Sequence, residues 1–202
     1  MPENDDDLDN LKLASKITVD LIKSINNEVG KKDDLGRLEW LEEHVNVKGV
    51  GFKFCSNTNM MGQRKLLYYG PFVKESNGKE LYGLLFNDSF LVVESYESLH
   101  NEIFRVKCNR LQLYKHPILL ENITNVQSKM TLSTNSLGSD CIFQIVVGDK
   151  EYSFKTVNPA LKNEWVKQLQ KGIESYRQKK RSITQSLSAC KKIIFFTFKS
   201  MK

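Results

Sequence analysis

The chain has 202 residues and a formal net charge of +6; 40% of the residues are hydrophobic and 27% are charged. This length suits one domain plus an extension, and the composition is ordinary for a globular protein. The charge is uneven: residues 1–10 hold five acids and no base, whereas residues 171–202 hold nine Lys or Arg and one acid. The basic end could meet an anionic membrane or nucleic acid, or it could be solvated and disordered.

Several classes of site and location are disfavoured by simple patterns. Cys55, Cys108, Cys141 and Cys190 show no CxxC spacing, which argues against zinc. The acidic start is unlike a signal peptide, and no apolar run approaches the roughly 20 residues that span a bilayer. We therefore expect a cytosolic protein with reduced thiols, peripheral at membranes if it meets them.

Helical periodicity dominates the first 47 residues. Two sets of apolar residues recur at steps of three or four: Leu8, Leu11, Ala14, Ile17, Leu21, Ile25 and Val29, then Leu35, Leu38, Leu41 and Val45. They predict either a helical hairpin or one long helix with a weak point at Gly30. Such a helix is not stable alone in water, so it should pack on the rest of the chain or on something that is missing.

Strand patterns follow an irregular connector that is rich in Gly, Asn and Ser. We predict seven strands, at residues 64–75, 81–86, 90–96, 103–109, 110–120, 141–147 and 151–157. Tight turns are expected at Asn77-Gly78, Asn87-Asp88 and Gly148-Asp149. Residues 127–140 are polar and should form a loop or frayed strand ends.

A single amphipathic helix closes the predicted fold. Asn158 suits the cap and Pro159 the first helical position, while Leu161, Trp165, Leu169 and Ile173 form one apolar stripe. Seven short strands and then one helix predict an α+β, mainly β fold. We expect a bent sheet or partly open barrel, capped by the C-terminal helix and preceded by the long N-terminal helix.

This order, with Trp165 in NEWVKQLQ, resembles a pleckstrin homology (PH) domain over about residues 62–178. The stretch DDLGRLEWLEEHV and the FCSNTNMMGQRKLLYYG that follows resemble a junction in Rho-family guanine nucleotide exchange factors. There, the last helix of the Dbl homology (DH) domain runs into the PH domain. The likeness is strongest to the intersectin group, through RLEW, GQRKLLYYG, SNGKELYGLLFND, LYKHPILLENI and ESYRQKK.

The resemblance implies four parts: residues 1–47 as the final helix of a truncated DH domain, 48–63 as a connector, 64–178 as the PH domain, and 179–202 as a basic, disordered tail. A DH domain is a larger helical bundle. We therefore expect a fragment or short form without exchange activity, which would contact a Rho-family GTPase only through the missing DH domain. The implied role is to regulate or position the exchange domain at membranes in signalling and endocytosis. The alternatives are a piece of an active exchange factor, or a protein-interaction module that ignores lipid.

PH domains that bind phosphoinositides carry basic residues around their first loop, and the match here is incomplete. Lys74 and Lys79 fit two family places, Leu81 stands at a third, and Glu75 and Glu80 lie beside the lysines. The sequence therefore predicts weak attraction to anionic lipids with little headgroup preference, unless this is merely a solvated loop. The residues expected to contribute are Arg64, Lys65, Lys74 and Lys79.

No catalytic, metal or cofactor site is predicted. His44, His100 and His116 are scattered without an accompanying carboxylate pair or nucleophile, and the first three cysteines suit apolar filling. Aromatic residues at strand spacing suit the core, with Trp165, Leu161 and Leu169, and not nucleic-acid binding. The tail segment KKIIFFTFK (191–199) is aggregation-prone; it could dip into a membrane surface, or be a peptide that selection has not shaped.

Overall fold

A computed structural model describes residues 5–47, 49–58, 60–94, 103–105, 111–129 and 141–200. The chain forms two compact units, Met1–Arg37 and Leu38–Lys202, which are described separately. Their boundary falls inside one helix, α1 (Asp5–His44). Of the two predicted arrangements, the single long helix is therefore confirmed. Gly30 does not interrupt it, because an interior glycine costs a helix only about 1 kcal/mol.

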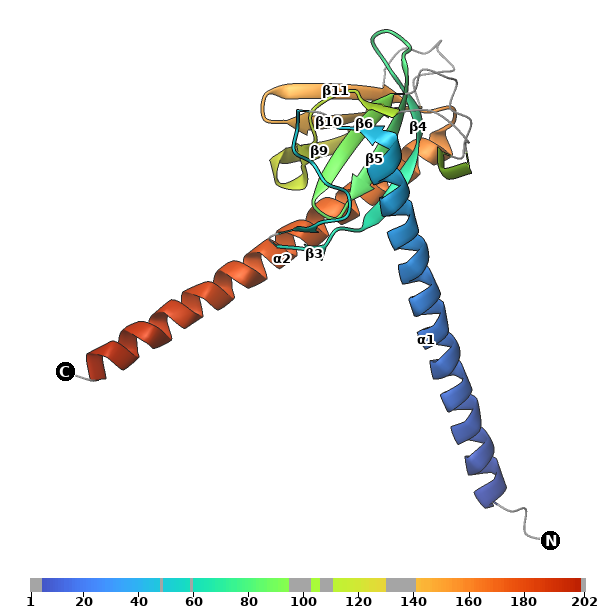
Figure 1. Cartoon of the computed structure of the whole chain (residues 1–202), viewed down its shortest axis with the longest axis vertical. Helices are drawn as coiled ribbons and strands as arrows, with labels where there is room; N and C mark the ends of the chain where they lie inside the picture. The colour runs from blue at the N-terminus through green and yellow to red at the C-terminus, as the bar shows by residue number, and fades with distance from the viewer. Residues whose placement is uncertain are drawn as a thin grey trace. The chain divides into compact units, whose positions relative to one another are not determined.

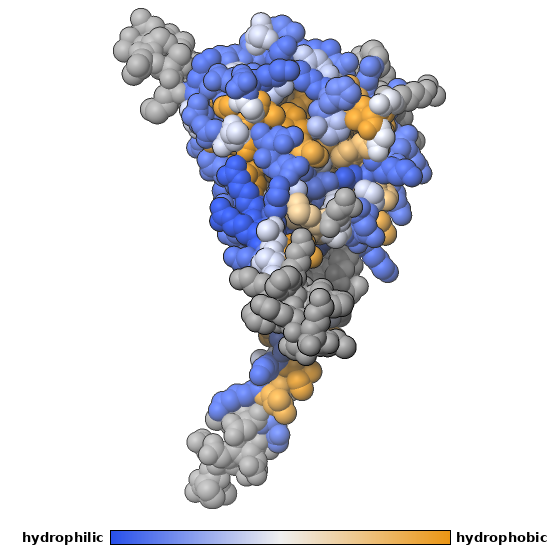
Figure 2. All heavy atoms as spheres, turned by 90° about the vertical axis from the view of Figure 1, so that its left-hand side faces the viewer, coloured by the Kyte–Doolittle hydropathy of each residue, from blue (hydrophilic) through white to orange (hydrophobic). Residues whose placement is uncertain are grey.

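The first unit leaves its apolar residues on the surface. Figure 2 shows hydrophobic side chains exposed on this helix, and six large ones exceed 40% exposure: Leu11, Leu13, Ile17, Val19, Leu21 and Ile22. An isolated helix with such a stripe is marginal in water. That this apolar face packs on a partner therefore remains a prediction.

The last turns of α1 belong to the second unit. Leu38 and Leu41 are buried in a cluster with strand residues that include Tyr82 and Phe86. Glu42 also fixes the connector, since its Oε2 accepts hydrogen bonds from the backbone N–H groups of Phe54 (2.5 Å) and Cys55 (3.2 Å). The body of the domain thus begins near Leu38, earlier than the predicted residue 64.

The second unit is built on an open, mixed sheet of nine strands (Figure 1). The strands are β1 (Val45–Asn46), β4 (Leu66–Lys74), β5 (Glu80–Phe86), β6 (Ser89–Glu94), β7 (Leu111–Leu113), β8 (Ile118–Leu119), β9 (Ile123–Ser128), β10 (Ile142–Val147) and β11 (Lys150–Lys155). Their order is β1-β7-β6-β5-β4-β11-β10-β9, with β8 paired to β6. A two-stranded sheet, β2 (Asn57–Thr58) and β3 (Gly62–Gln63), lies in the predicted connector.

The predicted meander from β4 to β6 is confirmed, and so are its turns. Gly78, in the β4–β5 turn, and Gly148, in the predicted turn between β10 and β11, take φ values of 66° and 57°, the left-handed region that glycine adopts without strain. Neighbouring strands of the nine-stranded sheet pair antiparallel, except that β1 runs parallel to β7. The predicted fold class, a PH-like bent sheet capped by a helix, is therefore confirmed.

Two strand predictions were wrong, and strand β9 was missed. Residues 103–105 form a 3₁₀ helix, η1 (Ile103–Arg105), whose Ile103 is buried; 106–109 lie outside the described residues. The predicted strand at 110–120 is split into β7 and β8, followed by a second 3₁₀ turn, η2 (Leu120–Asn122). Strand β9 was missed because its buried residues, Ile123 and Val126, are three apart and give no two-residue alternation.

The capping helix α2 (Pro159–Ser200) begins as predicted, with the Leu161 N–H donating to Asn158 Oδ1 at 2.8 Å. Trp165 is 1% exposed and Leu169 is fully buried, whereas Leu161 is half-buried. The helix does not end near residue 178 but continues through the predicted disordered tail. Neither glycine nor proline occurs after Gly172, so nothing in this sequence breaks the helix.

Leu41→Ala should lower the free energy of unfolding of the second unit by about 2–5 kcal/mol, the usual cost of truncating a buried leucine. Leu21, 58% exposed on the same helix, is the matched control, and Leu21→Ala should change stability by less than about 0.5 kcal/mol. Urea unfolding followed by tryptophan fluorescence measures both. Equal effects would show that the body does not begin at Leu38.

Candidate functional site

A basic cavity of about 530 Å³ lies at one end of the sheet in the second unit. Lys74 ends β4, Lys150 begins β11, and Lys115 lies in the segment between β7 and β8. The other lining residues are Glu75, Ser76, Val92, Tyr114, Ile118, Glu151, Tyr152, Ser153 and Phe154. Three segments far apart in sequence thus bring three lysines to one opening.

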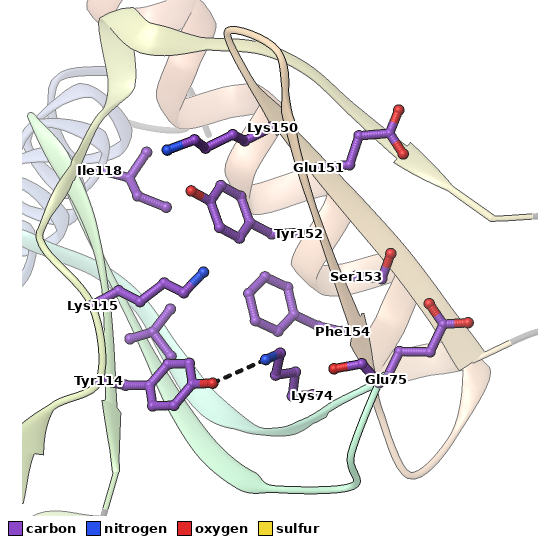
Figure 3. A pocket seen from close by; sticks show the side chains of 12 residues that line it. Lys74, Glu75, Tyr114, Lys115, Ile118, Lys150, Glu151, Tyr152, Ser153 and Phe154 are labelled. Carbon is purple, nitrogen blue, oxygen red and sulfur yellow. Dashed lines mark hydrogen bonds between the residues drawn. The ribbon is translucent and has the colours of Figure 1, made fainter.

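Two tyrosines hold two of these lysines in place (Figure 3). Lys74 Nζ donates a hydrogen bond to the Tyr114 hydroxyl at 3.1 Å. Lys115 Nζ stands 4.1 Å from the centre of the Tyr152 ring, within the range of a cation–π contact. The floor is apolar, because Phe154 and Val92 are buried. The cavity therefore combines positive charge at its rim with an apolar base.

The nearby acids do not neutralise this rim directly. In Figure 3 the carboxylates of Glu75 and Glu151 point away from the three lysine side chains. Glu75 is paired with Lys129, its Oε1 lying 3.0 Å from the ammonium nitrogen. These acids weaken the positive field without filling the cavity.

Of the four predicted lipid contacts, Lys74 is the one that lines the cavity. Lys79 forms an ion pair with Glu94 and stands 5.0 Å from the Tyr114 ring centre, beside the cavity. Lys65 is exposed and follows Arg64 before β4. Leu81, at the third family place, is buried.

Arg64 must be removed from the predicted set, because it is only 8% exposed. Its Nη2 lies 2.5 Å from Asp88 Oδ2 and its Nε donates to Asp88 Oδ1 at 3.0 Å. The guanidinium also donates to the Lys53 carbonyl and covers the Phe52 ring at 3.9 Å. Arg64 is thus a structural residue that ties the connector to the β5–β6 turn.

Lys115 and Lys150 were missed by the sequence analysis. Lys115 stands beside a turn in LYKHP, and Lys150 stands beside a turn in GDKEY. Turns lie at the ends of a sheet, where binding residues are common. That local signal marks them as candidates, but their approach to Lys74 depends on strand pairing between distant segments.

The described residues offer little support for metal binding or for catalysis. No group of three or more His, Cys, Asp or Glu there could hold a metal ion. Burial, and then the charges of Glu42 and Glu39, raise the pKa of the Cys55 thiol, which disfavours the reactive thiolate. The ring of His44 stacks on that of Trp40, with 4.1 Å between the ring centres, and Cys141 is buried in the core. His100 and Cys108 lie outside the described residues. Within the described chain, no helix is both long and apolar enough to cross a membrane.

Known proteins resemble this chain in sequence and in structure. Intersectin-1 of Xenopus laevis is 33% identical over 182 residues, and Intersectin-2 of Mus musculus is 32% identical over 183; each alignment covers 87% of this chain. The chain spans only about a tenth of the length of these relatives.

Solved structures of exchange factors share the fold. A structure of Vav1 matches with a TM-score of 0.59 and 14% identity, covering 85% of this chain and 40% of that one. The DH/PH domains of PDZ-RhoGEF, solved in complex with activated RhoA, match with a TM-score of 0.54 and 14% identity, covering 78% and 44%. The family model described as "Pleckstrin homology domain" matches residues 45–194. The chain therefore belongs to the pleckstrin homology domain family and is homologous to intersectin.

Proposed function

We propose that this chain is a non-catalytic PH module of an intersectin-like Rho exchange factor, which positions or regulates an exchange domain at anionic membranes. The observation that carries the proposal is the cavity rimmed by Lys74, Lys115 and Lys150. Ammonium groups attract phosphate and carboxylate groups, and the neighbouring hydroxyls of Tyr114 and Ser153 add donors.

The same cavity favours weak and unselective binding. Lysine acts as a point charge and not as a planar fork, so it gives little geometric discrimination between headgroups. Glu75 and Glu151 at the rim further reduce the net field. The contact set differs from the one predicted from sequence, but the expected behaviour, a salt-sensitive attraction to anionic lipid, is the same.

We further propose that the first unit is the final helix of a DH domain, as its resemblance implies. Its exposed apolar stripe would then pack against other DH helices, and the 202 residues by themselves would not accelerate nucleotide release from a Rho-family GTPase. The exchange activity of such factors would remain a property of the longer protein.

A protein-interaction module is the second candidate, and the groove between β9 and α2 is its best location. Strand β9 is an edge of the sheet, where an extended peptide could add. However, Gln170 Nε2 donates to the Val126 carbonyl at 3.0 Å and Arg177 Nη2 donates to the Ile123 carbonyl at 2.9 Å. Because these side chains already satisfy two edge carbonyls, we favour the lipid function.

Sedimentation with vesicles tests the proposal. The cavity variant, Lys74→Gln with Lys115→Gln and Lys150→Gln, should bind phosphatidylserine-containing vesicles about tenfold or more weakly, because each lysine near an anionic surface contributes about 1 kcal/mol. Vesicles of equal charge that contain a phosphoinositide should bind the wild type about as well. Tight binding to one phosphoinositide at physiological salt would contradict the weak, unselective site.

The matched control removes the same charge elsewhere. Lys155, Lys167 and Lys171 are exposed and lie outside the cavity, so their replacement by glutamine should weaken binding less than the cavity variant does. An equal loss in both variants would mean that total charge, and not the cavity, attracts the membrane.

A further inference from the structure

The second half of α2 leaves the sheet (Figure 1). Tyr176 is its last buried side chain in the described region, and two contacts with the body follow at once. Lys179 Nζ donates to the Met61 carbonyl at 3.3 Å, and Lys180 Nζ pairs with Glu121 at 2.7 Å. Beyond them, residues 181–188 are exposed apart from half-buried Ile183, and the helical backbone continues to Ser200.

The sequence of this projecting half carries charge of one sign. Residues 181–202 contain five Lys or Arg and no Asp or Glu. A solvated helix in a globular protein usually mixes both signs, because pairs of opposite charge four residues apart stabilise it. A purely basic helix is instead typical of contact with an anionic partner.

An apolar stripe follows the same helix. Five residues recur at steps of four, three, four and four, which places them on one helical face: Ile183, Leu187, Cys190, Ile194 and Phe198. Leu187 is 60% exposed, so at that position the face is uncovered. In proteins, most of the stability of a helix comes from burying such an apolar face.

We propose that residues 181–200 form an interfacial helix that lies on an anionic membrane surface, with its apolar face toward the acyl chains and its lysines at the phosphates. The helix is basic and amphipathic, with phenylalanines between lysines, as such helices are. This proposal is independent of the lysine cavity.

The observations favour a membrane over other occupants. A second copy of the helix would bring two purely basic surfaces together, which like-charge repulsion opposes. A protein groove must match the anchor residues in shape, whereas an anionic lipid surface requires only positive charge and one apolar face.

The test uses the full chain in the background of the cavity variant, so that the cavity does not contribute. This protein should still sediment with phosphatidylcholine vesicles that contain phosphatidylserine, and much less with pure phosphatidylcholine. Adding Leu187→Ser and Ile194→Ser, which preserve every charge, should weaken that binding about tenfold or more. The thermal midpoint of the sheet should not change, because Leu187 is exposed and none of residues 181–188 is buried.

Ala189→Ser with Phe196→Ser is the matched control, since it has the same seven-residue spacing on another face of the helix. This pair should retain most of the vesicle binding. The proposal is overturned if the cavity variant shows no residual binding, if the stripe substitutions leave binding unchanged, or if the control loses as much. It is also overturned if the helix binds calmodulin, an acidic groove protein, and ignores vesicles.

Discussion

Trp165→Ala is expected to leave the second unit largely unfolded. The indole is 1% exposed and meets aromatic rings from several strands, among them Tyr68 at 4.7 Å and Phe72 at 5.4 Å between centroids. Truncating a buried tryptophan costs about 3–5 kcal/mol, which approaches the whole stability of a small domain. Circular dichroism and thermal unfolding measure the loss, and an unchanged thermal midpoint would contradict the described core.

A glycine pair tests the same contact without removing the indole. Gly70 and Gly83 face each other across β4 and β5. A Cβ at Gly83 would lie 2.6 Å from Trp165 Cη2 and 2.5 Å from Phe72 Cε1, whereas at Gly70 the nearest indole atom is 3.7 Å away. Gly83→Ala should therefore destabilise the domain strongly and Gly70→Ala only mildly. If Gly70→Ala were the more destabilising, the indole of Trp165 could not lie against Gly83.

Arg64→Ala is expected to destabilise the domain by about 3–5 kcal/mol, because it leaves the Asp88 carboxylate partly buried without its partner. The side chains of this ion pair are 9% and 13% exposed. The neighbouring Lys65 is exposed, so Lys65→Ala should have little effect on urea unfolding.

A double-mutant cycle separates the interaction energy of the Arg64–Asp88 ion pair from the cost of truncating each side chain. Arg64→Ala with Asp88→Ala removes the stranded charge, so the double variant should be more stable than the sum of the two single losses predicts. Strict additivity would show that the two residues act independently, and Arg64 could then be reconsidered as a surface residue.

Local patterns were enough to predict the elements that turn residues or caps delimit. The apolar runs and the turn residues between them, from Leu66 to Glu94, indicate the meander, and Asn158-Pro159 marks the start of α2. Strand β9 escaped because its buried residues are three apart, and η1 looked like a strand because Ile103 and Phe104 are apolar. In both places tertiary burial, and not local periodicity, decides the structure.

The site was harder to predict than the fold. Lys74 could be found from its place beside the first turn, but Lys115 and Lys150 join it only through the pairing of β4 with β11 and of β6 with β7. Arg64 illustrates the opposite error. A basic residue next to Lys65 in sequence suggested a surface patch, while Asp88, 24 positions later, draws its guanidinium into the interior.

The most direct test of the proposed membrane function is to map where an anionic headgroup binds. The isotope-labelled protein, residues 1–202, would be titrated with inositol trisphosphate and observed by NMR. Binding should be weak and salt-sensitive, the largest amide shifts should fall around Lys74, Lys115 and Lys150, and these shifts should vanish in the cavity variant. Largest shifts in the groove between β9 and α2, or shifts that survive in the cavity variant, would contradict it.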